Sequence, residues 1–316
     1  MEILRTPDSC FANLRGYAFE PHYVEIPDLA GGTLRVHYVD EGPRDADPVV
    51  MLHGNPTWSY LWRTIIPPVA SQGWRVIAPD LVGLGRSDKP IEMADYSVAR
   101  HVEWMRSALI DTLGLQRISF VLHDWGGIIG LRILGEHPDR IARVVISNTG
   151  LPLRDPSEPM PPDADEPKGR LAAFQKMVRE APRWEPWNMI QATSPTQLPD
   201  EVIAAYRAPY PEDRYTIGSR AFTQLLPTTA DNPQYPANWG AWQVVQKFQN
   251  PFLTLYSDQD VVAPNGYRQF RDAVPGAMGQ PHAILKGGGH FLQEDVGDEY
   301  ADVLVKFLEA TRDGLG

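Results

Sequence analysis

Residues 118–136, ISFVLHDWGGIIGLRILGE, decide the fold of this 316-residue chain. The run from 118 to 123 is short and mainly apolar, which predicts a buried strand, and an apolar helical pattern follows from 128 to 136. The two meet at Asp124-Trp125-Gly126-Gly127, and small residues directly after such a turn are typical of a sharp strand-to-helix elbow. The elbow is expected to present Asp124 at the carboxyl end of a sheet, where open α/β folds bind ligands.

A second interpretation of Asp124 stays open at this point. An Asp before a helix commonly caps it, because its carboxylate accepts hydrogen bonds from the first free N–H groups. The elbow alone does not separate a catalytic carboxylate from a helix cap, so the rest of the chain has to decide.

Further short apolar runs along the chain have the length and composition of strands. The predicted strands are residues 35–39, 49–53, 75–79, 118–123, 143–147, 252–257 and 282–286. Between them, apolar residues recur at steps of three and four over 97–113 and 298–311, which predicts helices with one buried face. Strands that alternate with helices predict an α/β fold with a doubly wound, mostly parallel sheet and right-handed connections.

Residues 151–230 interrupt this alternation. The stretch 151–170 contains six prolines and five acidic residues, a composition that resists regular structure. The remainder has helix-like patterns without strand runs and carries large aromatic residues, namely Phe174, Trp184, Trp187, Tyr206, Tyr210, Tyr215 and Phe222. We therefore predict one core domain made of residues 1–150 and 231–316, with a helical cap of residues 151–230 inserted into it and packed over an apolar space.

Two more polar segments follow predicted strands. Asp258-Gln259-Asp260 comes after residues 252–257, and Gly287-Gly288-Gly289-His290 comes after residues 282–286. Parallel strands end at one edge of the sheet, so these side chains are expected near Asp124. The order along the chain is that of the nucleophile, acid and histidine in the α/β-hydrolase triad. Of the two candidate acids we prefer Asp260 to Asp258.

The segment His53-Gly54-Asn55-Pro56-Thr57-Trp58 follows the predicted strand 49–53. Folds of this kind supply one N–H of an oxyanion hole from this loop and the second from the residue after the nucleophile. We therefore expect the backbone N–H groups of Asn55 and Trp125 to stabilise an oxyanion. A tight structural turn at His53-Gly54 is compatible with the same residues.

The overall composition excludes several kinds of protein. With 29 Lys+Arg against 40 Asp+Glu, the net charge is −11 and basic residues form no block, which disfavours nucleic acid or a membrane surface as partner. Cys10 is the only cysteine, so an intrachain disulfide is impossible. The start, MEILRTPDSC, lacks the pattern of a secretory signal, and no apolar run is long enough to span a membrane. We expect a cytoplasmic protein and a monomer, although the sequence does not fix the oligomeric state.

Taken together, these motifs resemble the haloalkane dehalogenases of the α/β-hydrolase superfamily over nearly the whole chain. The similarity is most specific at HGNPTWSYLWR (53–63) and SDKP (87–90), and it extends to AYRAPYP (205–211) in the predicted cap. The elbow by itself is shared with epoxide hydrolases. Within the family, the chain is most similar to the subfamily typified by the 1,2-dichloroethane-degrading enzyme.

The resemblance implies a role for each candidate residue. Asp124 corresponds to a carboxylate nucleophile, His290 to the general base, and Asp260 to the acid that orients the base. Trp125 corresponds to a tryptophan that binds the departing halide through its indole N–H. Asn55 corresponds to an asparagine that has the same task in a related subfamily.

The second halide donor is where this chain departs from the subfamily it most resembles. That subfamily takes a second halide-binding tryptophan from the cap, whereas Phe174, which has no N–H, stands at the corresponding position here. We therefore expect Asn55 to be the second donor, with Trp184 or Trp187 as alternatives. Neither a metal nor an organic cofactor is expected.

A carboxylate nucleophile also limits the reaction. Its attack on an acyl carbon would give a labile anhydride, whereas displacement at a saturated carbon gives an alkyl ester. The expected substrate is therefore a halogenated alkane, with halide ion and water as the other participants. The alternative is an epoxide hydrolase with the same triad, in which Tyr206, Tyr210 or Tyr215 would protonate the epoxide oxygen.

Overall fold

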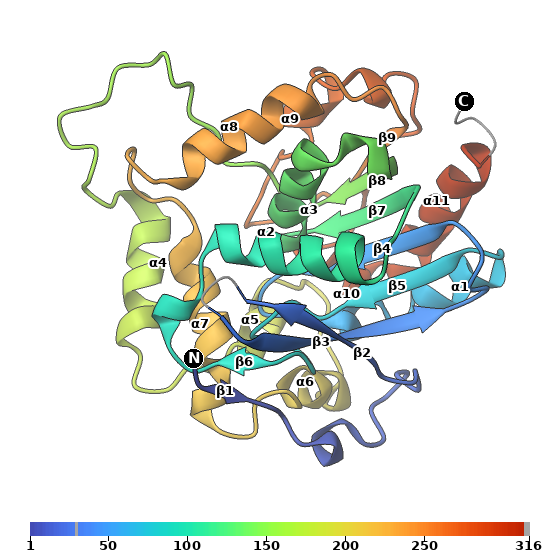
Figure 1. Cartoon of the computed structure of the whole chain (residues 1–316), viewed down its shortest axis with the longest axis horizontal. Coiled ribbons are helices and arrows are strands. Elements are labelled where there is room, and N and C mark those ends of the chain that lie inside the picture. The colour runs from blue at the N-terminus through green and yellow to red at the C-terminus, as the bar shows by residue number, and fades with distance from the viewer. Residues whose placement is uncertain (29–30, 313–316) are drawn as a thin grey trace.

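The computed structural model describes residues 1–28 and 31–312, and an eight-stranded sheet lies at its centre (Figure 1). The strands of this sheet are β2 (His22–Pro27), β3 (Thr33–Glu41), β4 (Pro48–Leu52), β5 (Arg75–Pro79), β7 (Ile118–His123), β8 (Ile141–Ser147), β9 (Phe252–Ser257) and β10 (Ala283–Leu285). Their order is β10-β9-β8-β7-β4-β5-β3-β2. Neighbours from β10 to β5 are parallel, and β3 and β2 are antiparallel additions at one edge. The predicted doubly wound, mostly parallel sheet is confirmed.

The sequence analysis missed β2, although it located the other strands of the sheet. β4, β7 and β8 are buried along their whole length, which explains their continuous apolar runs. β2 lies at the sheet edge and buries only Ile26 fully, so its sequence HYVEIP has no such run. A small separate ribbon pairs β1 (Ile3–Leu4) with β6 (Lys89–Pro90).

Helices cover both faces of the sheet (Figure 1). The helices of these layers are α1 (Ile66–Ser71), α2 (Val98–Arg106), α3 (Trp125–Glu136), α8 (Gln234–Val245), α9 (Arg268–Arg271), α10 (Leu292–Asp295) and α11 (Gly297–Ala310). α3 packs against β4, β7 and β8, with α2 and α8 beside it, while α1 and α11 pack together on the opposite face. The helix predicted over 97–113 is α2 followed by a wider, π-helical turn at Ser107–Thr112.

A second group of helices lies between β8 and β9 along the chain. It consists of α4 (Gly169–Glu180), α5 (Trp187–Ala192), α6 (Asp200–Arg207) and α7 (Ile217–Leu225). The long loop that joins β8 to α4 projects away from the rest of the molecule (Figure 1). α8, which comes next in the chain, packs against α3 and so belongs to the layers around the sheet.

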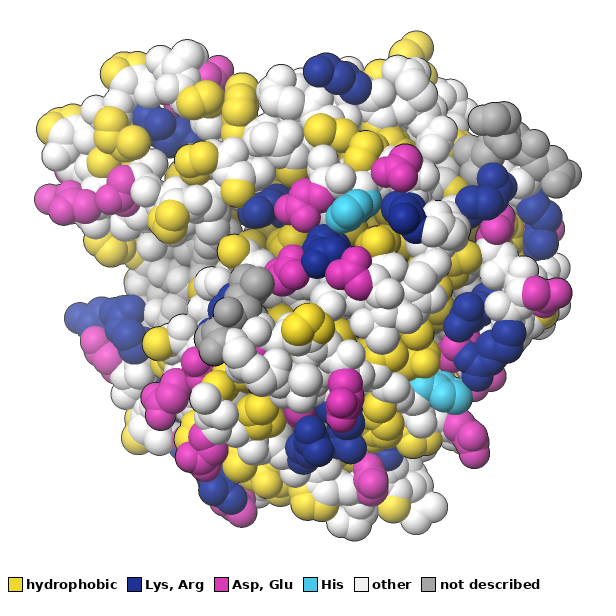
Figure 2. All heavy atoms as spheres, viewed as in Figure 1, with side chains coloured by type: hydrophobic (Ala, Val, Ile, Leu, Met, Phe, Trp, Pro, Cys, Tyr) yellow, Lys and Arg dark blue, Asp and Glu magenta, His cyan; other side chains and the backbone are white. Residues whose placement is uncertain are grey.

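The surface carries charges of both signs. Figure 2 shows acidic and basic side chains interspersed with apolar ones on the face viewed in Figure 1, without a separate basic field. Within residues 1–28 and 31–312, no helix combines the length and the apolar character that a membrane crossing needs.

Candidate active site

The elbow between β7 and α3 holds Asp124 in an unusual backbone conformation. Its φ is 51° and its ψ is −123°, a region that non-glycine residues rarely adopt and that costs energy. The chain passes so close to β4 that a Cβ at Gly126 would lie 2.1 Å from the carbonyl oxygen of Leu52. The hydroxyl of Thr149 donates a 2.7 Å hydrogen bond to the carbonyl oxygen of Asp124 and helps to fix the turn.

The carboxylate of Asp124 makes no capping hydrogen bond to α3. Its Oδ1 instead accepts a 2.8 Å hydrogen bond from the backbone N–H of Asn55, and the backbone N–H of Trp125 also lowers the pKa of the carboxyl group. Gly54 makes this approach possible, since a Cβ there would lie 2.0 Å from Oδ1. The other oxygen, Oδ2, lies 3.4 Å from Nε2 of His290. The two oxygens of one carboxylate therefore have different surroundings.

His290 lies between two carboxylates. Its Nδ1 donates a 3.0 Å hydrogen bond to Oδ1 of Asp260. The same carboxylate also accepts a hydrogen bond from the backbone N–H of Val262 at Oδ1 and one from the backbone N–H of Ala263 at Oδ2. The competing acid, Asp258, is exposed and accepts instead from the N–H of Gly287. The structure thus brings Asp124, His290 and Asp260 together and leaves Asp258 outside the cluster.

The charges of this cluster support one another. Burial opposes a charge on the ring, but the hydrogen bonds and charges of Asp124 and Asp260 outweigh it and raise the pKa of His290 to about 9. Burial would raise the pKa of each carboxyl group, yet the hydrogen bonds with His290 lower both below the usual value. At neutral pH the resting cluster is a cationic ring between two anions.

The loop that carries His290 is held by residues that the sequence analysis did not assign to the site. Nε2 of His123 donates a 2.8 Å hydrogen bond to the carbonyl oxygen of His290. The side-chain amide of Asn148 donates to the carbonyl oxygens of both Gly289 and His290, each at 2.9 Å. These partners lie about 140 residues or more before the loop, and they bind its backbone, so no pattern of side chains could have revealed them.

Trp125 and Asn55 both have N–H groups near Asp124. The indole of Trp125 is buried and lies against Phe222, with the ring centroids 5.3 Å apart. Within the described part of the chain, the side-chain amide of Asn55 has no hydrogen-bond partner, and its Oδ1 is buried.

Of the aromatic residues in the predicted cap, Trp184 has its indole N–H engaged elsewhere, and Trp187 and Phe174 make ring contacts. The indole N–H of Trp184 donates a 3.2 Å hydrogen bond to the hydroxyl of Ser219. Trp187 stacks on Tyr210 at a centroid distance of 6.2 Å. Phe174 is half-buried, and its ring lies edge-on to that of Trp184, with the ring centroids 6.4 Å apart.

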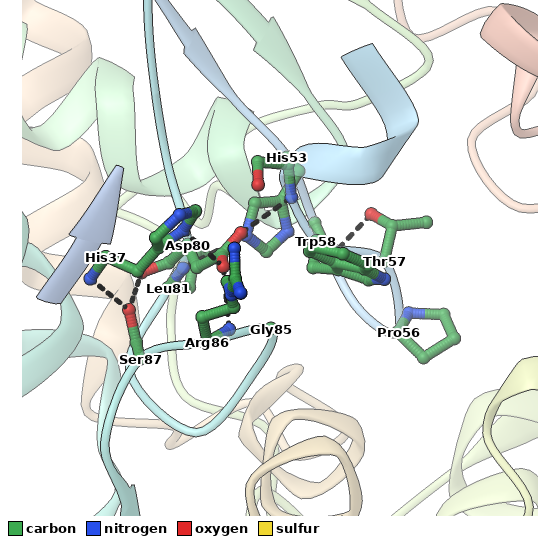
Figure 3. A network of polar contacts seen from close by, with 12 residues as sticks. His37, His53, Pro56, Thr57, Trp58, Asp80, Leu81, Gly85, Arg86 and Ser87 are labelled. Atoms are coloured by element: carbon green, nitrogen blue, oxygen red, sulfur yellow. Dashed lines mark hydrogen bonds and ion pairs between the residues drawn. The ribbon is translucent and has the colours of Figure 1, made fainter. Parts of the chain in front are cut away.

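A buried polar network supports the loop that contains Asn55 (Figure 3). At its centre, the fully buried carboxylate of Asp80 accepts hydrogen bonds from Nδ1 of His37 and from the backbone N–H groups of Ser59 and Arg86, at 2.7–2.8 Å. The next residue, Leu81, donates its N–H to Nε2 of His53 at 3.0 Å.

His53 carries this network to the elbow. Because Nε2 accepts from Leu81, the ring proton lies on Nδ1, which donates a 2.8 Å hydrogen bond to the carbonyl oxygen of Gly54. The hydroxyl of Thr57 donates to the same oxygen at 3.0 Å. The peptide that presents the N–H of Asn55 to the nucleophile is therefore held from its other side.

The described residues contain no group of three or more His, Cys, Asp or Glu arranged to hold a metal ion. A strained Asp at a strand-to-helix elbow, a backbone N–H from the loop after β4 on one of its oxygens and an Asp–His pair at the following strand ends define an α/β hydrolase. In agreement, the family model described as the alpha/beta hydrolase fold matches residues 47–295.

Comparison with characterised proteins narrows the family. The chain is 48% identical over 308 residues to a haloalkane dehalogenase of Psychrobacter cryohalolentis, with 98% of each chain covered. It is 42% identical over 311 residues to a haloalkane dehalogenase of Mycobacterium marinum, covering 97% of this chain and all of the relative. It therefore belongs to the haloalkane dehalogenase family.

Solved structures agree with this assignment. The haloalkane dehalogenase DpaA from Paraglaciecola agarilytica NO2, a tetramer, superposes with a TM-score of 0.85 at 28% identity, covering 98% of this chain and 99% of DpaA. DatA from Agrobacterium tumefaciens C58 has a TM-score of 0.75 at 23% identity, with 96% and 100% covered, which supports the shared fold.

Proposed function

We propose that this protein hydrolyses haloalkanes to an alcohol and a halide ion through a covalent ester on Asp124. The observation that carries the proposal is the unequal environment of the two Asp124 oxygens. Oδ1 accepts a hydrogen bond from the backbone N–H of Asn55, while Oδ2 lies 3.4 Å from Nε2 of His290 and is the oxygen that we assign to bond formation. A carboxylate arranged in this way is suited to displacement at a saturated carbon that bears a good leaving group.

In the first step, Oδ2 of Asp124 attacks the carbon that bears the halogen, a C–O bond forms, and the C–X bond breaks with its electron pair leaving on the halide. The developing negative charge needs N–H donors placed where it appears. We propose the indole N–H of Trp125 and the side-chain amide of Asn55 for this role. Phe174, Trp184 and Trp187 then contribute only packing of the cap.

In the second step, water hydrolyses the ester with His290 as the base. In the free enzyme His290 is protonated at neutral pH, since its pKa is about 9. Ester formation removes the charge of Asp124, so the pKa of His290 falls and the ring releases its proton. The neutral ring then takes a proton from water, which attacks Cγ of Asp124, and Asp260 stabilises the imidazolium.

The backbone N–H groups of Asn55 and Trp125 serve this second step as well. Negative charge develops on Oδ1 of Asp124 when water attacks, and Oδ1 is the atom that the N–H of Asn55 already contacts at 2.8 Å. A donor in place before the charge develops stabilises the transition state without reorganisation. When the intermediate collapses, the imidazolium of His290 gives its proton to Oδ2, which leaves with the alcohol. The carboxyl group that remains, now with the water oxygen, passes its proton to His290 and becomes a carboxylate again.

The epoxide hydrolase alternative needs a free tyrosine hydroxyl over the nucleophile. Tyr206 donates its hydroxyl to the carboxylate of Glu294, and Tyr210 points its hydroxyl at the carbonyl oxygen of Pro56, 3.5 Å away. Neither arrangement favours protonation of an epoxide by Tyr206 or Tyr210. Tyr215, the third candidate, is buried with the guanidinium of Arg214 over its ring, and the similarity to haloalkane dehalogenases also favours the halide reaction.

Three further proposals concern the whole protein. We propose that residues 151–230 act as the cap over the site, which α4 to α7 support by lying together between β8 and β9. We also propose a monomer, to be checked by light scattering because DpaA is a tetramer. A cytoplasmic location stays a prediction, consistent with a single cysteine.

Trapping the ester tests the proposed mechanism. In a His290→Ala variant, the first step still proceeds because it needs no base, but hydrolysis does not. Incubation with 1-bromobutane should therefore release one equivalent of bromide and add one butyl group to the intact protein, on the peptide that contains Asp124. An Asp124→Asn, His290→Ala double variant is the control and should remain unmodified.

Failure of this trap would reject the two-step scheme.

A substrate panel for the wild-type enzyme tests the class of reaction: 1-bromobutane and 1,2-dibromoethane should release halide, whereas styrene oxide and a nitrophenyl ester should not react. Turnover of styrene oxide without halide release from the alkanes would instead support the epoxide hydrolase.

A further inference from the structure

The loop of the catalytic base faces the core on one side and the cap on the other. The carbonyl oxygens of Gly289 and His290 point to the core, where Asn148 binds both. The N–H of His290 points the other way and donates a 3.0 Å hydrogen bond to the carbonyl oxygen of Thr193, the residue that ends α5. The base is thus fixed partly by a segment that belongs to the predicted cap.

Asp295 joins the same two parts. Its Oδ2 accepts a 2.8 Å hydrogen bond from the N–H of Gly289, the residue before the base. Its Oδ1 accepts a 3.2 Å hydrogen bond from the N–H of Thr196, in the loop between α5 and α6. One half-buried carboxylate therefore bridges the histidine loop and the segment 193–196.

The contact between these segments is close. A Cβ at Gly289 would lie 2.2 Å from the carbonyl oxygen of Thr193 and 3.2 Å from Oδ2 of Asp295, so only glycine fits there. The preceding acid, Glu294, provides a second connection, since it pairs with Arg63 and accepts the hydroxyl of Tyr206 on α6. α10 is therefore tied to the predicted cap at two consecutive residues.

We propose that Asp295 is a positioning residue for His290, which sets the base against the ester by tying the 193–196 segment to the N–H of Gly289. This inference rests on the proposed two-step mechanism. His290 acts only in the second step, so a displaced base slows ester hydrolysis and leaves ester formation unchanged. A residue that merely stabilised the fold would affect both steps or neither.

Rapid-quench kinetics of three variants test the proposal. Asp295→Ala removes both acceptors, Asp295→Asn keeps the size and one acceptor oxygen, and Asp298→Asn is the control, because Asp298 is an exposed acid three residues further on. Each is mixed with excess 1-bromobutane, and both bromide release and the alkylated fraction of the intact protein are followed.

In Asp295→Ala, the first equivalent of bromide should appear at the wild-type rate, and steady-state turnover should then fall by about tenfold, since small displacements of a catalytic group are costly. The alkylated fraction during turnover should rise accordingly. Asp295→Asn should lie between Asp295→Ala and the wild type, and Asp298→Asn should match the wild type.

Equal loss of the burst and of the steady state in Asp295→Ala, or no change in either, would overturn the positioning role. Neither result touches the proposed function, which fails if the wild-type enzyme releases no halide or if His290→Ala traps no ester. The two inferences can therefore fail separately.

Discussion

At the scale of single residues, the proposed halide donors are the indole N–H of Trp125 and the side-chain amide of Asn55. Trp125→Phe removes one N–H with little change in bulk, and Asn55→Ala removes the side-chain amide while leaving the backbone N–H that contacts Asp124. Each change should slow ester formation by about 100-fold, the usual cost of one lost donor at a developing charge. Single-turnover bromide release from 1-bromobutane measures it.

Trp184→Phe is the matched control for these two variants. Its indole N–H already bonds Ser219, so its loss should leave the rate of ester formation nearly unchanged. A large drop in Trp184→Phe together with a normal rate in Asn55→Ala would move the second donor from Asn55 to the cap.

At the scale of elements, the sequence predicts two kinds of feature: buried strands, which have continuous apolar runs, and polar residues that follow the end of a strand. The continuous apolar runs of β4, β7 and β8 were visible because both faces are buried, and Asp124 because it follows β7 directly. His290 follows the short edge strand β10, which is only partly buried, and was found from the three glycines before it. β2 was missed because an edge strand needs no such run. Asn148 and Asp295 were missed because they bind backbone groups, which leave no mark in the sequence.

The network around Asp80 shows how elements fix the site from a distance. Burial alone would raise the pKa of Asp80, but the ring of His37 and the backbone N–H groups lower it below the usual value. Asp80→Asn would turn an amide N–H toward groups that donate hydrogen bonds. It should lower the free energy of unfolding by about 3–5 kcal/mol, the usual cost of breaking a buried charged network, as measured by urea denaturation.

Asp8→Asn is the control for this change. Asp8 is 82% exposed and lies 3.7 Å from Arg86, so it shares a partner with the network without being buried. Its substitution should hardly alter stability. An Asp80→Asn variant as stable as Asp8→Asn would show that the buried carboxylate is dispensable for the fold.

At the scale of the whole molecule, buried histidines govern how stability depends on pH. Burial lowers the pKa of His101 to about 3 and that of His123 to about 4, both from the ordinary value of 6.5. Below pH 6.5 these two histidines bind protons in the unfolded chain but stay neutral in the folded chain, so the free energy of unfolding falls as the pH drops. The raised pKa of His290 acts in the opposite direction, because the stability it contributes is fully present below pH 6.5 and is lost as the pH rises through about 9. These three histidines alone therefore favour greatest stability near pH 6.5, whereas buried Lys89, whose pKa is lowered to about 7 by burial, opposes the loss of stability on the alkaline side.

Replacing His101 should flatten the acid side of this curve. The ring stacks on Phe222 at 4.1 Å, and both of its nitrogens lack a partner within the described residues, so His101→Phe keeps the packing and removes the titrating group. The slope of the free energy of unfolding against pH should be smaller in His101→Phe than in the wild type, by about 1 kcal/mol per pH unit. Urea denaturation between about pH 5 and pH 7 measures both slopes. An unchanged slope in His101→Phe would mean that the folded protein admits a proton to this ring, and that its contact with Phe222, and through it with Trp125, opens in mild acid.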